Sequence, residues 1–278
     1  MTTAVAGDVL ATADRAEFAA YADIWGAATP AAARDLGLFS ARVGPYTVLG
    51  CRAAPHAPML NRVLGAGLTL LSEAALAEAV ELLHGHGCVC QVALRDDGTD
   101  AAETRARLAA RGFADGYAWM RFLLPPGAAP RPASSPHART RVCGPEDAET
   151  FGATFAAGYE LPPPFAGVAA GLVGRSDWTC VIAEAPDGTP MGTGALWMDD
   201  GVAWLGMGAT VPAMRGRGAQ GAVLAARIRL AWDAGCHTVT TETGARASGA
   251  PEASYRNILR AGFTEAGARP NLVAPPPA

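Results

Sequence analysis

The chain has 278 residues, half of them apolar and 17% charged, which is typical of a folded globular protein with room for two domains. A net charge of −4 and a pI near 5.7 argue against nucleic acid or an anionic membrane as partner. The sequence has no long uncharged apolar window, no secretory pattern and six cysteines without framework spacing, so we expect a cytoplasmic protein with reduced thiols.

The spacing of apolar residues in the first 124 residues predicts alternating helices and strands. Helices are expected at 8–29, 72–84 and 104–111, and strands at 42–52, 61–68, 88–94 and 117–124. The 42–52 segment predicts a hairpin because Gly44-Pro45 interrupts it, and Ser72 is a typical N-cap.

Residues 125–138 contain five prolines in fourteen positions. A segment of this composition cannot build a core and is typical of a linker. We therefore predict an N-terminal domain at 1–124, a linker at 125–138 and a C-terminal domain at 139–278.

The second half predicts a similar alternation. Strands are expected at 139–142, 177–184, 190–198, 237–243 and 263–273, with a further strand from Trp204, and helices at 146–158 and 252–260. Pro186-Asp187-Gly188 is a typical hairpin turn between two of the strands.

A loop dense in arginine and glycine, Arg215 to Gly221, separates the Trp204 strand from a strongly helical segment, and Pro212 closes the strand. Glycines let backbone N–H groups turn inward, and a helix N-terminus adds unpaired N–H groups and a positive dipole end. The pattern predicts a phosphate or pyrophosphate site.

The two halves resemble one another, which predicts an internal duplication. Residues 63–68 match 204–209, Gly87-Cys88 matches Gly235-Cys236, and 111–113 match 261–263. Between the first two matches the second half is seven residues longer, about the length of the Gly-Arg loop. The first half is therefore predicted to be a copy that lost this loop.

The second half, over about 139–274, resembles the GNAT superfamily of acyl-CoA-dependent N-acetyltransferases. The family motif, Arg/Gln-x-x-Gly-x-Gly/Ala, corresponds to Arg215-Gly216-Arg217-Gly218-Ala219, with Gln220 where the family prefers Gly or Ala. Pro212 and the stretch from Asn257 to Gly262-Phe263 match further family features. The resemblance implies an α/β (α+β) fold of tandem GNAT-like domains, each with a mixed, mostly antiparallel twisted sheet flanked by helices.

The resemblance also implies acetyl-CoA as cosubstrate, no metal, and transfer of the acetyl group to the primary amine of a small molecule by direct attack in a ternary complex. The residues implied to bind the cofactor are Ala209, Thr210, Val211, Arg215, Gly216, Arg217, Gly218, Ala219, Gln220, Gly221 and Asn257. In the family the loop holds the pyrophosphate, and the preceding strand pairs with the pantetheine arm and polarises the thioester carbonyl through a backbone N–H. A homodimer is one possible assembly.

Two residues are candidates for proton transfer. Glu242, at the end of a predicted strand, is the candidate base that neutralises the attacking amine, although proximity alone can suffice for a thioester. Many family members have a tyrosine that protonates the leaving thiolate where this chain has Ile258; Tyr255, one helical turn earlier, is the candidate replacement. The apolar stretch 151–174, in the place where the family selects the acceptor, predicts a partly hydrophobic amine.

Three other interpretations compete. Gly216-x-Gly218-x-x-Gly221 with Glu242 fits a dinucleotide fingerprint, but too few residues follow for the remaining βαβ units. His84, His86, Cys88 and Cys90 could suggest a metal site, but the pattern fits a helix end and a buried strand better. A non-catalytic acyl-CoA sensor or interaction protein is the main alternative to an enzyme.

Overall fold

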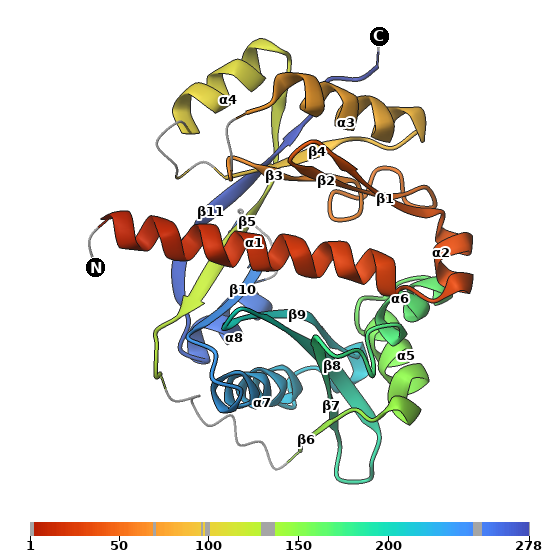
Figure 1. Ribbon diagram of the computed structural model, residues 1–278. Coiled ribbons are helices and arrows are strands. Elements are labelled where there is room, and N and C mark those ends of the chain that lie inside the picture. The colour runs from red at the N-terminus through yellow and green to blue at the C-terminus, as the bar shows by residue number, and fades with distance from the viewer. Residues whose placement is uncertain are drawn as a thin grey trace.

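The computed structural model describes residues 3–68, 71–95, 97, 101–128, 137–246 and 252–277. Eleven strands form one mixed sheet in the order β1-β2-β3-β4-β11-β5-β10-β9-β8-β7-β6 (Figure 1). The strands are β1 (Leu38–Val43), β2 (Tyr46–Cys51), β3 (Arg62–Ala66), β4 (Gln91–Leu94), β5 (Ala114–Leu124), β6 (Arg139–Val142), β7 (Trp178–Glu184), β8 (Pro190–Asp199), β9 (Val202–Thr210), β10 (Thr238–Gly244) and β11 (Thr264–Val273).

Helices cover both faces of this sheet. They are α1 (Thr3–Ala27), α2 (Pro30–Leu36), α3 (Glu73–Gly85), α4 (Ala101–Ala110), α5 (Ala148–Gly158), α6 (Ala166–Ala170), α7 (Ala219–Asp233) and α8 (Ala253–Arg260), with 3-10 turns η1 (Pro145–Asp147), η2 (Pro163–Phe165) and η3 (Pro212–Met214). Only the β3–β4 and β9–β10 pairs are parallel among the strand pairs of the described residues. The predicted α/β fold, a mostly antiparallel sheet flanked by helices, is confirmed.

The two halves of the chain exchange their last strands. β5, which ends the first half, pairs antiparallel with β10 of the second half through Glu242 opposite Arg121. β11, which ends the second half, pairs with β4 of the first half and lies between β4 and β5. Each half of the sheet is therefore completed by a strand from the other half, and the sheet is continuous.

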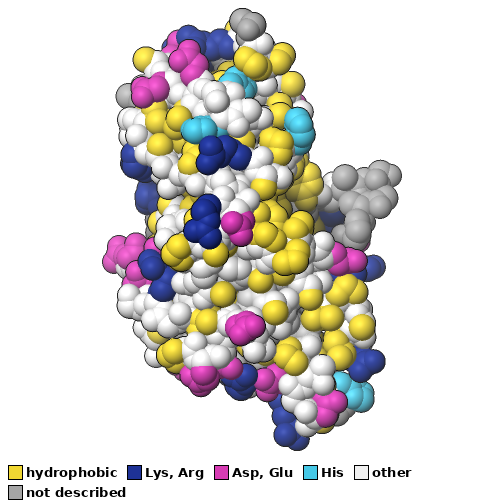
Figure 2. Space-filling view, turned by 90° about the vertical axis from the view of Figure 1, so that its right-hand side faces the viewer, with side chains coloured by type: hydrophobic (Ala, Val, Ile, Leu, Met, Phe, Trp, Pro, Cys, Tyr) yellow, Lys and Arg dark blue, Asp and Glu magenta, His cyan; other side chains and the backbone are white. Residues whose placement is uncertain are grey.

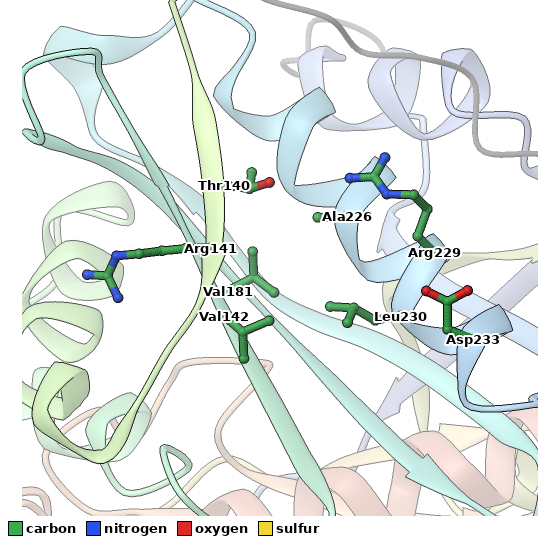
Figure 3. A pocket seen from close by; sticks show the side chains of 8 residues that line it. All are labelled: Thr140, Arg141, Val142, Val181, Ala226, Arg229, Leu230 and Asp233. Carbon is green, nitrogen blue, oxygen red and sulfur yellow. The ribbon is translucent and has the colours of Figure 1, made fainter.

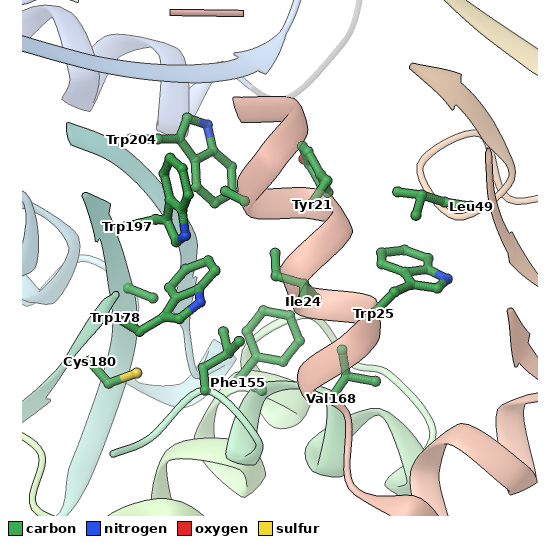
Figure 4. Packing of buried hydrophobic residues seen from close by; sticks show 14 of the residues in the cluster. Tyr21, Ile24, Trp25, Leu49, Phe155, Val168, Trp178, Cys180, Trp197 and Trp204 are labelled. Carbon is green, nitrogen blue, oxygen red and sulfur yellow. The ribbon is translucent and has the colours of Figure 1, made fainter. Parts of the chain in front are cut away.

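Successive side chains of a strand point to opposite faces of the sheet, so the core has one part on each face. Leu49 and Leu64 point toward α1, whereas their neighbours Val48 and Val63 join the cluster with α3. In the second half, α1, α5 and α6 cover one face, and α7 and α8 cover the other. On the α1 face a buried cluster joins Tyr21 and Ile24 of α1 to residues of α5, α6 and the second-half strands, whereas Trp25 points toward Leu49 of β2 (Figure 4). Those partners include Phe155, Val168, Trp178, Trp197 and Trp204.

A buried cluster of ion pairs links α1 to the exchanged strands β5 and β11. Arg269 of β11 donates to Asp14 at 2.7 Å and to both oxygens of Glu17, and Arg121 of β5 donates to Asp14 at 2.9 Å. Burial alone would raise the pKa of Glu17, but Arg269 reverses this and lowers it. Arg62 of β3 completes the cluster, 3.9 Å from Glu17. Burial of such groups is tolerable only because each charge faces an opposite one.

Several elements differ from those predicted. The predicted first helix ends at Ala27, close to its expected end, but a second short helix, α2, follows that was not predicted. Pro30 is its first residue, and the Thr29 hydroxyl caps it. Ser72 precedes α3 as predicted, but its side chain makes no capping hydrogen bond; its N–H and C=O meet the Tyr46 hydroxyl instead. The proline-rich turn after α5 is followed by a short helix, α6, which the sequence analysis did not predict.

The division into domains at 1–124 and 139–278 stays a prediction, and residues 129–136 of the predicted linker lie outside the described residues. Among the helices that are described, none has the length and apolar character to cross a membrane. On the side where α2, α5 and α6 lie in Figure 1, hydrophobic side chains gather near the middle of the surface (Figure 2).

Candidate functional site

The two parallel strands of the second half separate partway along their length. β9 and β10 pair at Val202–Thr238, Ala203–Val239 and Trp204–Thr240, and there the pairing stops. The Thr241 hydroxyl still donates to the Leu205 carbonyl at 2.8 Å, so the separation begins just beyond this bond. We call the stretch where Gly206–Thr210 of β9 and Glu242–Gly244 of β10 run without pairing to one another the gap.

A β-bulge shapes the β9 side of the gap. Gly206 pairs with Ala195 of β8, but the next pair is Ala209 with Thr193, so the register shifts by one residue. Met207, inside the bulge, has a φ of 54°, a conformation that is rare for a residue with a side chain. After the bulge, Val211 donates to the Met191 carbonyl at 2.9 Å. The predicted cofactor residues Ala209, Thr210 and Val211 thus pair with β8 on one edge and leave the other edge toward the gap.

The Gly-Arg loop lies at the end of the same strand. After the turn η3, Gly216 and Gly218 both have φ near 80° (79° and 86°), which glycine adopts without strain. Among the described residues, none comes within 4 Å of the position a Gly216 Cβ would take, and Gly218 is the N-cap of the fifteen-residue helix α7. No acidic side chain occupies the first turn of α7, so its N–H groups and dipole favour an anion.

Two other predicted cofactor residues meet beside this loop. The Asn257 amide of α8 donates to the Gln220 side chain at 2.6 Å, and Gln220 in turn donates to Ser254 at 3.1 Å. Arg260 holds the Asn257 oxygen at 3.0 Å. Gln220, which departs from the family pattern, therefore links the first turn of α7 to α8.

Arg215 connects the loop to the end of α5. Its guanidinium donates to the Gly158 carbonyl at 3.2 Å and lies 3.5 Å from the Glu160 carboxylate. Gly158 makes this packing possible, because a Cβ there would come within 2.7 Å of the Ala209 side chain. The end of α5 therefore rests directly on the end of β9.

Glu242 lies at the β10 side of the gap and faces α1. Its two oxygens accept hydrogen bonds from the Tyr21 hydroxyl at 2.9 Å and from the Trp204 indole at 3.1 Å. Burial, and then the neighbouring Glu17, raise the pKa of Glu242 well above its ordinary value. A hydrogen bond between the two carboxyl groups, Glu242 and Glu17, adds to the rise of the Glu242 pKa and to the lowering of the Glu17 pKa.

Tyr255 lies on the opposite face of the sheet. Its hydroxyl donates to Glu265 at 2.6 Å, its ring meets Phe122 edge-on, and Arg246 stacks over it at 4.2 Å. Burial, with the Glu265 hydrogen bond, raises the pKa of Tyr255 to about 12. Glu242 and Tyr255, the two predicted catalytic residues, are thus separated by the sheet.

The hydrogen bonds that side chains make around the gap were not predicted from the sequence. The Tyr159 hydroxyl, from the C-cap of α5, donates to the Gly208 carbonyl in the bulge at 2.9 Å. Arg227 of α7 reaches the same bulge from the other face of the sheet. Tyr159 lies in the predicted acceptor stretch 151–174, but nothing in the sequence ties Tyr21 to Glu242, 221 residues away.

A surface pocket lies at the edge of the sheet, between β6 and the second half of α7 (Figure 3). Val142, Val181, Ala226 and Leu230 line it, and the Arg141 side chain points away from it toward Asp147, 2.5 Å away. It lies at the opposite end of α7 from the Gly-Arg loop, and is separate from the gap.

Comparison with known proteins places this geometry in a fold family. No protein-family model and no curated protein matches the sequence. A GCN5-related N-acetyltransferase from Kribbella flavida aligns with a TM-score of 0.59 at 18% identity, over 89% of this chain and 97% of its own. One from Sphaerobacter thermophilus aligns at 0.58 and 18%, over 82% of this chain and 79% of its own.

A tandem GNAT protein from the clavulanic acid biosynthesis pathway aligns with a TM-score of 0.55 at 18% identity, over 85% of this chain and 82% of its own. At such identities a structural likeness establishes the fold. The chain therefore has the tandem fold of the GCN5-related N-acetyltransferase superfamily, and the resemblance seen in the sequence is confirmed at that level.

Proposed function

We propose that this protein is an N-acetyltransferase that transfers the acetyl group of acetyl-CoA to the primary amine of a small molecule. The observation that carries the proposal is the gap between β9 and β10, which leads to a glycine-rich loop at the N-terminus of α7. A long cosubstrate with a pyrophosphate at one end and a thioester at the other fits such a combination.

The residues present suit such a ligand. The open space at Gly216 allows the loop backbone to approach a pyrophosphate, and the exposed Arg215 and Arg217 add positive charge. The unpaired edge of Ala209, Thr210 and Val211 offers backbone groups to the amides of a pantetheine arm. Asn257 and Gln220 lie beside the same loop and complete the proposed cofactor contacts.

In the proposed reaction the amine nitrogen attacks the thioester carbon, the C–S bond breaks, and the proton that the amine loses ends on the thiol of CoA. We propose Glu242 as the base that receives this proton first, directly or through water. Its raised pKa makes the carboxylate a stronger base, which suits a reaction near neutral pH. For Tyr255, tied to Glu265 on the other face, we propose a structural role.

The acceptor proposed is small and partly hydrophobic. Tyr159, at the end of α5, is half exposed and lies against the bulge, so its ring is placed beside any group that enters the gap from the α5 side. The hydrophobic side chains that gather near the middle of the face shown in Figure 2 support an acceptor with an apolar body. A homodimer stays a prediction.

Titration calorimetry with acetyl-CoA and with NADH, followed by a thiol-release assay over a panel of primary amines, tests the proposal. We expect acetyl-CoA to bind with one site per chain, NADH not to bind, and at least one amine to release CoA. Absence of acetyl-CoA binding would contradict the proposal.

A non-catalytic acyl-CoA sensor is the second candidate. One observation favours it: α1 covers the face of the sheet on which Glu242 lies, and the Tyr21 hydroxyl donates a hydrogen bond to one oxygen of the Glu242 carboxylate. Tight acetyl-CoA binding with no acetylated product from any amine in the panel, checked by mass spectrometry, would support the sensor over the enzyme.

A further inference from the structure

The bulge of β9 is held by side chains from three different elements. The Gly206 carbonyl accepts from Arg227 of α7 at 2.8 Å, the Met207 carbonyl from the Thr193 hydroxyl of β8 at 3.1 Å, and the Gly208 carbonyl from the Tyr159 hydroxyl at 2.9 Å. Three successive carbonyls are therefore fixed in direction. The peptide planes of the bulge are fixed with them.

Arg227 is the unusual member of this set because it is a buried cation without an acidic partner in the described part of the chain. The residue is 3% exposed, and its guanidinium donates to the carbonyls of Ala195, Gly206 and Val223. Burial lowers the pKa of Arg227 to about 10, which still leaves it charged at neutral pH. A Gly194 Cβ would lie 2.6 Å from the Arg227 Cζ, so the glycine in β8 makes room for the guanidinium.

Burying a guanidinium against carbonyls alone is costly, since no carboxylate offsets the lost hydration. The buried arginines of the α1 cluster, by contrast, all face carboxylates. Charged groups with a shifted pKa and no oppositely charged partner cluster at functional sites. The Arg227 guanidinium is such a group, and it bonds to the Gly206 carbonyl at the edge of the gap.

The position of the guanidinium determines where one backbone N–H points. Its Nη1 atom bridges Ala195 of β8 and Gly206 of β9, at 3.0 and 2.8 Å, so it lies on the β8 side of the bulge. The Gly206–Met207 peptide is trans, so the Met207 N–H points the opposite way, toward the gap. A cation on the carbonyl of a peptide polarises that peptide and makes its N–H a stronger donor.

We propose that Arg227 is a positioning residue for acyl transfer: it orients and polarises the Gly206–Met207 peptide so that the Met207 N–H stabilises a thioester carbonyl oxygen in the gap. The proposal rests on the proposed function. When the amine nitrogen bonds to the carbonyl carbon, the C=O π pair moves to this oxygen. When that pair returns, the C–S bond breaks and the sulfur leaves with its electrons, to take up the proton lost by the amine.

Isotope-edited infrared spectroscopy of acetyl-CoA labelled with ¹³C at the acetyl carbonyl tests the proposal without an acceptor. The wild-type protein is expected to shift the carbonyl band of the bound ligand to lower wavenumber than in solution. Arg227→Met and Arg227→Gln are expected to bind acetyl-CoA with little change in affinity but to lose most of that shift. Arg229→Met, a change to an exposed arginine on the same helix, is the matched control and keeps the shift.

Turnover with an amine from the panel gives a second readout. We expect kcat to fall roughly 10- to 100-fold in the Arg227 variants, somewhat less than for outright loss of an oxyanion donor, with KM for acetyl-CoA unchanged. Should Arg227→Met not fold, Arg227→Gln, which keeps a neutral donor for the carbonyls, decides the matter.

The outcomes separate the two proposals. If wild-type protein binds no acetyl-CoA, the proposed function falls and this inference with it. If wild-type protein binds it without a carbonyl shift, or the Arg227 variants keep the full shift, Arg227 does not position the acyl group, whereas the proposed function stands.

Discussion

The two halves of the chain contain the same strand–helix–strand unit, but only one of them is open. In the first half, β3 and β4 stay paired past the irregularity at Gly65, as far as Ala66 opposite Leu94. The backbone N–H of Arg95 then donates to the Ala66 carbonyl at 2.9 Å, which extends the hydrogen bonding between the two strands. In the second half, pairing stops at Trp204 opposite Thr240, and the gap follows.

Two local differences accompany the closure. A Gly67 Cβ would lie only 2.2 Å from the Arg95 carbonyl, so the first-half strands are packed where the second-half strands are apart. In the alignment of the halves, Leu94 occupies the position of Glu242. An apolar side chain suits a closed strand pair, and a carboxyl at the same position needs a polar opening or hydrogen-bond donors.

The extra seven residues of the second half are not a single inserted loop, which corrects that prediction. By the same alignment, β9 runs three residues beyond the position where β3 ends, the connection to the helix is two residues longer, and α7 is two residues longer than α3. The halves therefore differ by a longer strand and helix as much as by the Gly-Arg loop. The open half differs from the closed half because β9 continues to Thr210 beyond Trp204, where its pairing with β10 ends.

The largest expected effect comes from removing the carboxylate of Glu242, which the closed half lacks at the matching position, Leu94. We expect Glu242→Gln to lower kcat by about 10²- to 10⁴-fold, the range for loss of a general base, with acetyl-CoA affinity unchanged. The thiol-release assay measures it, and Glu149→Gln, at an exposed glutamate of α5, is the control. A Glu242→Gln enzyme with wild-type kcat would remove Glu242 from the mechanism.

The same substitution has a pH signature in stability. Because the folded protein raises the pKa of Glu242 above its ordinary 4.5, its ionisation destabilises the fold increasingly as the pH rises through and above that value. Glu242→Gln removes this penalty, so its melting temperature relative to wild type should increase between about pH 4 and pH 7. A difference that shrinks with rising pH would contradict the raised pKa.

The next effect concerns the cluster that joins the halves. Arg269→Met leaves Asp14 and Glu17 buried without their main partner, and we expect a loss of about 3–5 kcal/mol of unfolding free energy. Arg175→Met is the matched control, because it also breaks an ion pair with α1, to Asp23, but at the surface, and should cost under about 1 kcal/mol. Urea unfolding measures both; equal losses would mean that the buried cluster does not hold the halves together.

The next prediction addresses the Gly-Arg loop of the second half. Gly218→Val forces a side chain onto a residue with a φ of 86° and crowds the N–H groups before α7, so acetyl-CoA affinity should fall about 100-fold or more. Gly235→Val introduces the same residue at a φ of 79° just beyond the other end of α7 and serves as the control. Calorimetry should find binding lost in the first variant alone; equal affinities would show that the anion site lies elsewhere.

The smallest effect is expected at Tyr255, on the face away from Glu242. Tyr255→Phe removes the bond to Glu265 and should cost about 1 kcal/mol of stability, with kcat changed less than about threefold. A fall of about 100-fold in kcat would instead restore Tyr255 as the acid that protonates the thiolate.

Local signals in the sequence were enough to predict much of this fold. Gly44 marks the β1–β2 turn, Pro212 ends β9 before the loop, and Gly218 precedes α7, each through a conformational preference of one residue. The exchange of β5 and β11 could not be predicted in this way. Either strand could complete either half of the sheet, and the choice depends on contacts such as Arg269 with Asp14, 255 residues apart.

The same contrast holds for the candidate site. The loop residues and Asn257 follow a family spacing, and the structure brings Asn257 to Gln220. Arg227 follows no motif and looks like any other arginine in a helical stretch. Its burial becomes visible only when Gly194 of β8 and the bulge of β9 are placed around it.

A crystal structure of the protein with coenzyme A tests the central claim, that the open half binds the cosubstrate and the closed half does not. We predict one CoA per chain, its pyrophosphate on the backbone of residues 215–221, its pantetheine arm along Ala209–Val211, and its sulfur in the gap near Met207. CoA bound at β3 and β4, or a gap left empty at saturating CoA, would contradict the account.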